Sequence, residues 1–381
     1  MSDTPQADRI EGAPHPRETL RVIGQATAEA DFLQAFNSGR LHHGWLITGP
    51  RGVGKASLAW RIARFLLATP MDDGNDMFGG PPEAHSLEIS PEHPVARRVL
   101  AMSEPGLFLL RRGGAGSTEA DREKNLNDGK FAAEIRVDEV RKLANFFHMS
   151  ASDGGRRVVI VDAADEMNVQ AANALLKMLE EPPANTTLLL VCHQPTRILP
   201  TIRSRCRELR LSPLSPENMA LALEQAQINL HDNPAGLAEL AAGSVGEAIR
   251  LVNLGGMQMY QELVGLYSTL PQMDRARALK LAEAAAARGA DAKLNLLLSL
   301  NDLLLTRLAR AGTLGHPPQT EAVPGEAALL TRLAPDPHKA RAWAQTAQQI
   351  SARMQHGRAV NLDPTALILD TVFKIQQTAA G

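Results

Sequence analysis

Two short apolar runs that flank one amphipathic helix constrain the fold of this chain more than any other feature. The first run covers residues 158–161 and ends on Asp162, and the second covers residues 188–192 and leads to His193. Between them, apolar residues recur about every 3.6 positions over 169–179, which predicts a helix with one buried face. This order predicts a parallel α/β sheet with helices on both faces, because parallel strands need a crossover connection. Ligands bind such sheets at the carboxyl ends of the strands, so Asp162 and His193 are candidate site residues.

Another strand candidate, residues 45–48, runs directly into a glycine-rich loop. The loop reads GPRGVGK, and a helical pattern follows it over residues 58–66. This is the context in which a loop cradles phosphate, because glycine lets successive backbone N–H groups converge at a helix N-terminus. We therefore predict a nucleotide phosphate site formed by Gly49, Gly52, Gly54 and Lys55. The alternative, a glycine turn with a solvated lysine, is disfavoured by the flanking strand and helix.

The position after the loop lysine departs from the phosphate-binding motif. A P-loop places a Ser or Thr hydroxyl there as a magnesium ligand, but this chain has Ala56, and Ser57 comes one position late. We include Ala56 and Ser57 in the candidate nucleotide site. The site is expected to bind phosphate without a firm magnesium ligand.

Two stretches carry a resemblance to a known family. Residues 172–183, ANALLKMLEEPP, and residues 204–206, SRC, resemble signature stretches of bacterial clamp-loader ATPases of the AAA+ class. Within that family the chain is most similar to the delta prime type of DNA polymerase III subunit. The resemblance implies an α/β RecA-like AAA+ module, a small helical lid domain and an all-helical collar domain. The expected divisions are a flexible tail over 1–16, the P-loop domain over 17–211, the lid over 212–258 and the oligomerising collar over 259–381.

The resemblance also implies roles for residues at the strand ends and in the lid. Asp162 takes the place of the acid that holds magnesium through water, and His193 that of the first sensor of the terminal phosphate. Active members carry a glutamate after that acid and an arginine in the lid, where this chain has Ala163 and Gly246. The acids at 165–166 come too late to replace the glutamate and are expected to be helix-start charges. We therefore expect ATP or ADP binding without hydrolysis.

Arg205 is the candidate residue with a role outside this chain. Its neighbours Arg203 and Arg207 alternate with it, which predicts one basic face on an extended or turning segment. The resemblance implies that Arg205 is an arginine finger that reaches into the ATP site of a neighbouring subunit. Such a guanidinium stabilises charge on a transferring phosphoryl group. The alternative is a surface segment with ordinary ion pairs.

Composition excludes several other classes of protein. With 40 basic and 42 acidic residues, the chain lacks the excess positive charge of a protein that binds DNA broadly by itself. Two cysteines cannot form a four-thiolate zinc site, and residues 69–106 lack the four-cysteine module that the family often holds there. The absence of an apolar run of membrane-spanning length predicts a cytoplasmic protein without membrane partners. The polar stretch 112–130 is expected to be a surface loop or a partly disordered insertion.

The sequence therefore predicts an assembly component, a delta prime-type subunit without independent ATPase activity. The implied partners are the clamp-loader gamma or tau and delta subunits of the DNA polymerase III holoenzyme, and through them the sliding clamp and primed DNA. The main alternative is a catalytically active gamma/tau-like ATPase subunit, which Lys55 and Asp162 favour and Ala56, Ala163 and Gly246 oppose. A P-loop kinase is a more distant alternative that the SRC stretch and the helical last third disfavour.

Overall fold

The computed structural model describes residues 5–10, 12–70, 83–149, 155–228, 233–287, 291–360 and 362–381. It divides into two compact units. The first, called here the α/β unit, comprises Met1–Ile228 with Gly243–Gly246, and the second, the helical unit, comprises Asn229–Ala242 with Glu247–Gly381.

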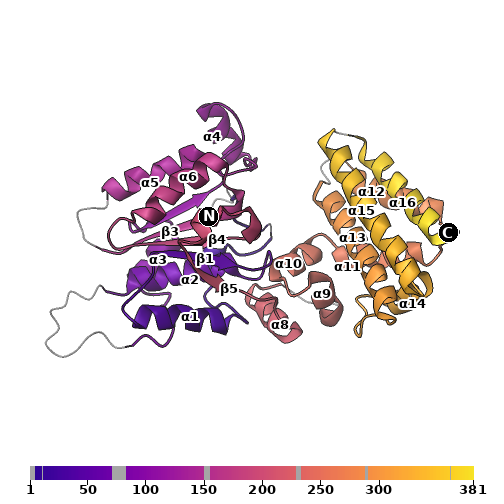
Figure 1. Ribbon diagram of the computed structural model, residues 1–381, viewed down its shortest axis with the longest axis horizontal. Helices are drawn as coiled ribbons and strands as arrows, with labels where there is room; N and C mark the ends of the chain where they lie inside the picture. Colours follow the sequence, from indigo (N-terminus) through magenta and orange to yellow (C-terminus); the bar gives the residue numbers. More distant parts are fainter. Residues whose placement is uncertain are drawn as a thin grey trace. The chain divides into compact units, whose positions relative to one another are not determined.

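A single five-stranded sheet forms the centre of the α/β unit. Its strands are β1 (Gly44–Thr48), β2 (Leu107–Arg111), β3 (Arg157–Asp162), β4 (Thr186–Val191) and β5 (Arg207–Arg210). All neighbouring pairs are parallel, in the order β2-β3-β4-β1-β5 (Figure 1). In this register Arg111 at the end of β2 lies opposite Asp162 at the end of β3. The parallel α/β sheet predicted from the sequence is confirmed.

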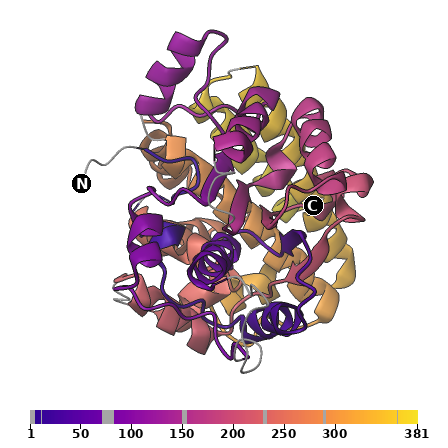
Figure 2. The same ribbon diagram turned by 90° about the vertical axis from the view of Figure 1, so that its left-hand side faces the viewer.

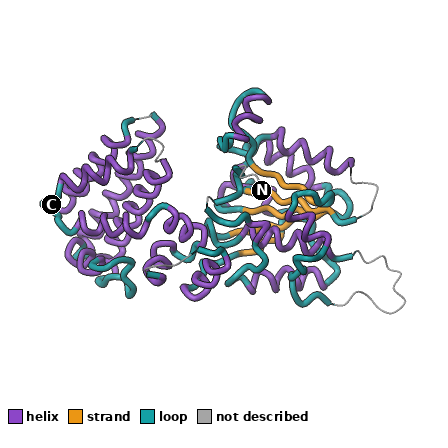
Figure 3. Tube along the Cα trace, turned by 180° about the vertical axis from the view of Figure 1, so that it is seen from behind, coloured by secondary structure: helices purple, strands orange, loops and turns teal. Residues whose placement is uncertain are grey.

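Helices cover both faces of the sheet, because successive strand residues point to opposite sides. In β4, Leu189 and Val191 pack into the core on one face, and Leu188 and Leu190 pack into the core on the other. The first face is covered by α1 (Ala26–Asn37), α2 (Lys55–Ala68) and α3 (Pro94–Leu100), and the second by α5 (Val137–Met149) and α6 (Val169–Glu180). Figure 3 shows the strands as a layer between these helices, and Figure 2 shows α1 and α2 end-on, side by side.

Part of the expected flexible tail is held against the sheet. Asp8 accepts a hydrogen bond from His15 Nε2 at 3.0 Å and pairs with Arg111 at the end of β2. His15 is fully buried, and its ring meets Trp60 edge-on with centroids 5.7 Å apart. The expectation of a loose segment over 1–16 is therefore wrong for its described second half. Its anchors, Trp60 and Arg111, are both distant in the sequence.

The polar stretch after β2 also differs from the expected surface loop. It contains α4 (Glu119–Asn127), a helix without a buried residue. The Thr118 side chain caps its first turn by accepting a hydrogen bond from the Asp121 N–H at 3.2 Å. A capped helix with no apolar face shows no hydrophobic periodicity, which is why the sequence did not reveal it.

The helical unit follows the sheet and contains most of the remaining helices. They are α9 (Pro234–Ala241), α10 (Val245–Asn253), α11 (Gly256–Tyr267), α12 (Arg275–Ala286), α13 (Asp291–Leu314), α14 (Glu326–Leu333), α15 (Pro337–Ala359) and α16 (Pro364–Ala380). The leucines of α13 are buried on several sides, as expected for a central helix. The α/β unit ends with α7 (Pro200–Arg203) and α8 (Pro216–Gln225). The first helix of the expected lid thus groups with the sheet, and most of the rest of the lid with the helical unit.

A buried acid ties helices of the helical unit together. The Glu326 carboxylate accepts hydrogen bonds from Tyr260 Oη at 2.6 Å, Arg307 Nε at 2.6 Å and the Ala322 N–H at 2.7 Å. A buried charge is tolerated when its oxygens are satisfied in this way. Among the described residues, no helix is both long and apolar enough to span a membrane.

Candidate functional site

The glycine loop lies between β1 and α2, as the sequence predicts. Gly49, Gly52 and Gly54 have φ values of 138°, 79° and 100°, a backbone region that favours glycine. A Cβ on Gly49 would lie 2.5 Å from the Leu211 carbonyl oxygen. The loop therefore keeps the curled backbone that a phosphate cradle needs.

Lys55 is turned onto its own loop. The side chain is buried, and its Nζ donates to the Gly49 carbonyl at 2.7 Å and to the Pro50 carbonyl. Burial lowers the pKa of Lys55 to about 8, against the opposing effect of Asp165. Lys55 is therefore still charged at neutral pH, but a phosphate must compete with two carbonyls for it.

The hydroxyl of Ser57 does not replace the one that Ala56 lacks. Ser57 Oγ donates toward Thr19 Oγ1, 3.4 Å away, on the segment that precedes α1. Among the described residues, no group of three or more acids, histidines or cysteines is placed to hold a metal ion. Residues 71–82 of the region expected to lack zinc lie outside that description.

The lid segment packs directly on the glycine loop. The Gly246 N–H donates to the Gly52 carbonyl at 3.1 Å, and a Cβ on Gly52 would lie 2.2 Å from Ser244 Oγ. A Cβ on Gly246 would lie 2.7 Å from Ile10 Cδ1 and 3.0 Å from Gly52 Cα. The position where active members carry a sensor arginine thus has little room for a side chain.

Asp162 ends β3 in an acidic environment. Burial, together with the carboxylates of Asp8 and Glu166 and against the opposing charges of Lys55 and Arg111, raises its pKa to about 7. Asp162 therefore holds its proton to a much higher pH than an exposed aspartate does. A protonated acid is a poor ligand for magnesium, directly or through water.

His193 lies close to Lys55, two residues after the end of β4. Burial and the charge of Lys55 lower the pKa of His193 to about 4, so its ring is neutral at pH 7. Its Nδ1 is buried without a hydrogen-bond partner in the described part of the chain. The sensor role predicted for His193 stays a prediction.

The acids at 165–166 lie in the first turn of the short 3-10 helix η2 (Ala164–Glu166), and each also contacts groups outside that turn. Asp165 is buried and accepts the backbone N–H groups of His193 at 2.9 Å and Gln194 at 3.1 Å. Glu166 pairs with Arg51 of the glycine loop at 2.9 Å and with Arg112 at 3.0 Å. Both acids fix the strand ends around the loop, and neither is free to activate water.

Arg205 lies at the opposite end of the sheet from the glycine loop. It follows α7 and precedes β5, and its carbonyl oxygen would be 3.1 Å from a Cβ on Gly44, the first residue of β1. Five strand steps of about 3.3 Å separate Gly44 from Gly49, roughly 16 Å. An arginine side chain cannot cover that distance, so Arg205 does not serve the glycine loop of its own chain.

The sequence suggested that the three alternating arginines share one basic face, but their environments differ. Arg203 ends α7, and the Arg207 guanidinium lies over the Trp45 ring, 5.2 Å from its centroid. Arg205 alone forms an ion pair with Glu180 at the end of α6, at 2.9 Å, and its side chain stays 38% exposed.

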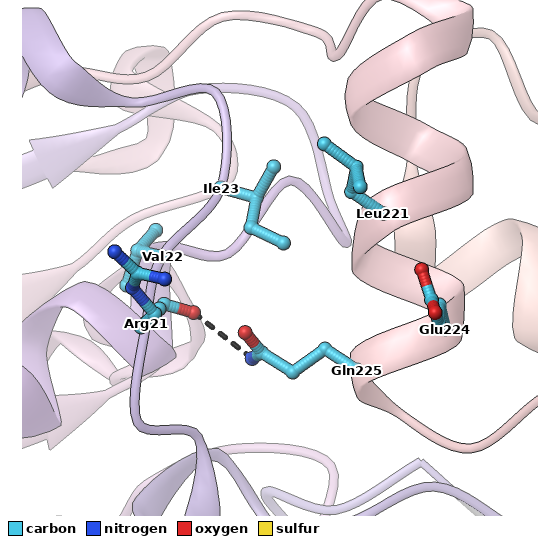
Figure 4. A pocket seen from close by; sticks show the side chains of 6 residues that line it. All are labelled: Arg21, Val22, Ile23, Leu221, Glu224 and Gln225. Atoms are coloured by element: carbon cyan, nitrogen blue, oxygen red, sulfur yellow. Dashed lines mark hydrogen bonds between the residues drawn. The ribbon is translucent and has the colours of Figure 1, made fainter.

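A cavity of about 460 Å³ lies beside the segment that leads to α1. Figure 4 shows its lining, with Arg21, Val22 and Ile23 on one side and Leu221, Glu224 and Gln225 of α8 on the other. Gln225 Nε2 donates to the Arg21 carbonyl at 3.0 Å. Nothing in the sequence marked these residues, because the cavity joins segments about 200 positions apart.

Comparisons with known proteins identify the family of the chain. A family model described as "DNA polymerase III, delta subunit" matches residues 24–215. The chain is similar to DNA polymerase III subunit delta' of Pseudomonas aeruginosa, 37% identical over 223 residues, covering 58% of each chain. It is also similar to subunit delta' of Escherichia coli, 32% identical over 219 residues (57% of this chain, 56% of that one). Subunit gamma/tau of Mycobacterium tuberculosis is 29% identical over 208 residues (55% and 31%). The match spans little more than half of the delta' relatives.

Proposed function

The chain belongs to the DNA polymerase III delta-subunit family of clamp-loader proteins, and from that membership we propose that it is the delta prime-type subunit of a clamp loader. In this role it is a RecA-like AAA+ module with a lid and a collar, working in the cytoplasm. It assembles with gamma or tau and delta subunits to help place the sliding clamp on primed DNA. Arg205 acts in trans at the ATP site of a neighbouring subunit.

The position of Arg205 is the observation that carries this proposal. It is 38% exposed at the amino end of β1, about 16 Å from its own glycine loop, so it does not contact a phosphate bound at that loop. A guanidinium supplied in trans is worth roughly 10³ to 10⁵ in rate where it stabilises phosphoryl transfer. Its planar fork suits phosphate oxygens better than a lysine ammonium does.

The proposed test uses the clamp loader reconstituted with gamma and delta subunits, clamp and primed DNA. Arg205→Ala should leave assembly intact and lower both stimulated ATP turnover and clamp loading. Arg205→Lys should restore little of either. Arg203→Ala is the matched control, because it removes the same charge two residues away and should leave both rates unchanged. Loading at the wild-type rate with Arg205→Ala would refute the role in trans.

We further propose that the chain binds ADP or ATP without hydrolysing it. The curled loop, Lys55 and the unpartnered Nδ1 of His193 would hold the phosphates. Ala56, Ala163 and Gly246 supply no hydroxyl, carboxylate or guanidinium for hydrolysis. Calorimetry with the pure chain should detect nucleotide binding that Lys55→Ala abolishes, and no turnover.

The gamma/tau-like alternative predicts turnover by the pure chain. The contacts of Asp165 and Glu166 oppose it, since both carboxylates are bound to backbone N–H groups or arginines. ATP hydrolysis by the pure protein that Lys55→Ala removes would favour that alternative.

A further inference from the structure

Two contacts fix the Arg205 guanidinium on the surface of its own chain. Its Nη2 pairs with Glu180 Oε1 at 2.9 Å, and its Nη1 donates to the Thr201 carbonyl oxygen at 3.1 Å. One contact comes from the end of α6 and the other from α7. Each of the two terminal nitrogens is therefore bound once, which sets the plane of the guanidinium.

The end of α6 that carries Glu180 is itself fixed to the sheet. Leu179 is buried, and its carbonyl oxygen is 2.9 Å from His43 Nε2, just before β1. A Cβ on Gly44 would lie 2.9 Å from Leu179 Cδ2 and 3.1 Å from the Arg205 carbonyl. Close packing at Gly44 thus holds both the helix end and the Arg205 turn, so Glu180 is presented by a rigid element.

The Glu180 and Thr201 contacts leave part of the guanidinium available. Arginine has five N–H groups, and these contacts use two of them. The side chain is 38% exposed, and that of Glu180 is 43% exposed. Arg207, by contrast, is stacked over Trp45. Of these two arginines, only Arg205 is held by an ion pair with a carboxylate.

We propose that Glu180 is a positioning residue for Arg205, holding the guanidinium so that its remaining N–H groups face the phosphates of a neighbouring subunit. This inference rests on the proposed function, because it gives Glu180 a role only if Arg205 acts in trans. Positioning contributes because a group held in the productive geometry loses less freedom when the complex forms. An exposed ion pair biases a side chain weakly, so loss of Glu180 should lower the rate about two- to fivefold.

The test uses the complete reconstituted clamp loader and measures DNA-stimulated ATP turnover. Glu180→Ala should lower kcat at the one ATP site that borders this chain about two- to fivefold, and should therefore lower total turnover less than Arg205→Ala does, with the KM for ATP unchanged, since Arg205 is still present but less well oriented. Glu180→Gln keeps an acceptor oxygen and should recover part of the loss. Glu181→Gln is the matched control, because it removes the neighbouring carboxylate, and it should behave as wild type. Glu180→Ala combined with Arg205→Ala should be no slower than Arg205→Ala alone.

The possible failures are distinguishable. If Arg205→Ala itself has no effect, the proposed function fails. If Arg205→Ala slows turnover but Glu180→Ala matches or exceeds wild type, only the positioning role of Glu180 is overturned. A double variant slower than Arg205→Ala would also overturn it, because Glu180 would then act through something other than Arg205. Thermal melting of Glu180→Ala should match wild type, since the pair is exposed.

Discussion

The two ends of β1 differ in what their charged groups contact. At the carboxyl end, Lys55 is bound to loop carbonyls, Asp165 to backbone N–H groups and Glu166 to two arginines. At the amino end, Arg205 is exposed and held by one carboxylate and one carbonyl. The charged side chains at the carboxyl end bind groups of their own chain, whereas Arg205 at the amino end remains partly accessible to solvent. The role proposed for Arg205 at a neighbour's ATP site requires such a difference.

Removing Asp165 should have the largest effect on stability. Asp165→Ala leaves the partly buried N–H groups of His193 and Gln194 without this acceptor, and bonds to a charged group contribute about 1.5 to 3 kcal/mol each. The free energy of unfolding in urea should fall by about 4 kcal/mol. Glu180→Ala at the other end should cost less than about 1 kcal/mol, as for other exposed pairs. Similar losses in the two variants would remove the contrast between the ends.

The pH dependence of stability should reveal the burial of Asp162. Its pKa is raised from an ordinary 3.8 to about 7. Between about pH 4 and 7 the folded chain holds a proton that the unfolded chain has released, so the free energy of unfolding falls as pH rises. Asp162→Asn should match wild type near pH 4 and be about 4 kcal/mol more stable at pH 8. Parallel stability profiles from pH 4 to 8 would contradict this.

Restoring the lid arginine should not restore hydrolysis. In Gly246→Arg the new Cβ must displace Ile10 and approach Gly52, which should destabilise the α/β unit by about 1 to 2 kcal/mol. The pure Gly246→Arg protein should hydrolyse no ATP, because Ala163 still supplies no carboxylate. Gly246→Ala is the control for the steric cost alone. ATP turnover by Gly246→Arg would mean that the lid arginine alone was limiting.

The sequence was sufficient to predict those features that depend only on neighbouring residues. The apolar run before Asp162 and the glycines before Lys55 correctly predicted strand ends and a loop, because side-chain period and glycine spacing are properties of neighbouring residues. The direction of the Lys55 side chain was not predictable, since it depends on which loop carbonyls point inward.

The sequence could not predict contacts between segments that are distant along the chain. Asp8 and His15 looked like parts of a polar tail because their partner Arg111 belongs to β2. Asp165 looked like a helix-start acid because its acceptor role depends on how β4 ends beside it. The partner of Arg205, Glu180, lies within a recognised stretch, but only the packing of α6 against β1 brings the two together.

The central claim is that this chain's own nucleotide end does not contribute to turnover, whereas its Arg205 end does. The most direct measurement compares Lys55→Ala and Arg205→Ala in otherwise identical reconstituted clamp loaders, following clamp- and DNA-stimulated ATP turnover and clamp loading. Lys55→Ala should leave turnover at the wild-type rate. Arg205→Ala should lower turnover partially, because only the site bordering this chain loses its arginine, and should lower loading more. Loss of turnover with Lys55→Ala and none with Arg205→Ala would contradict the account.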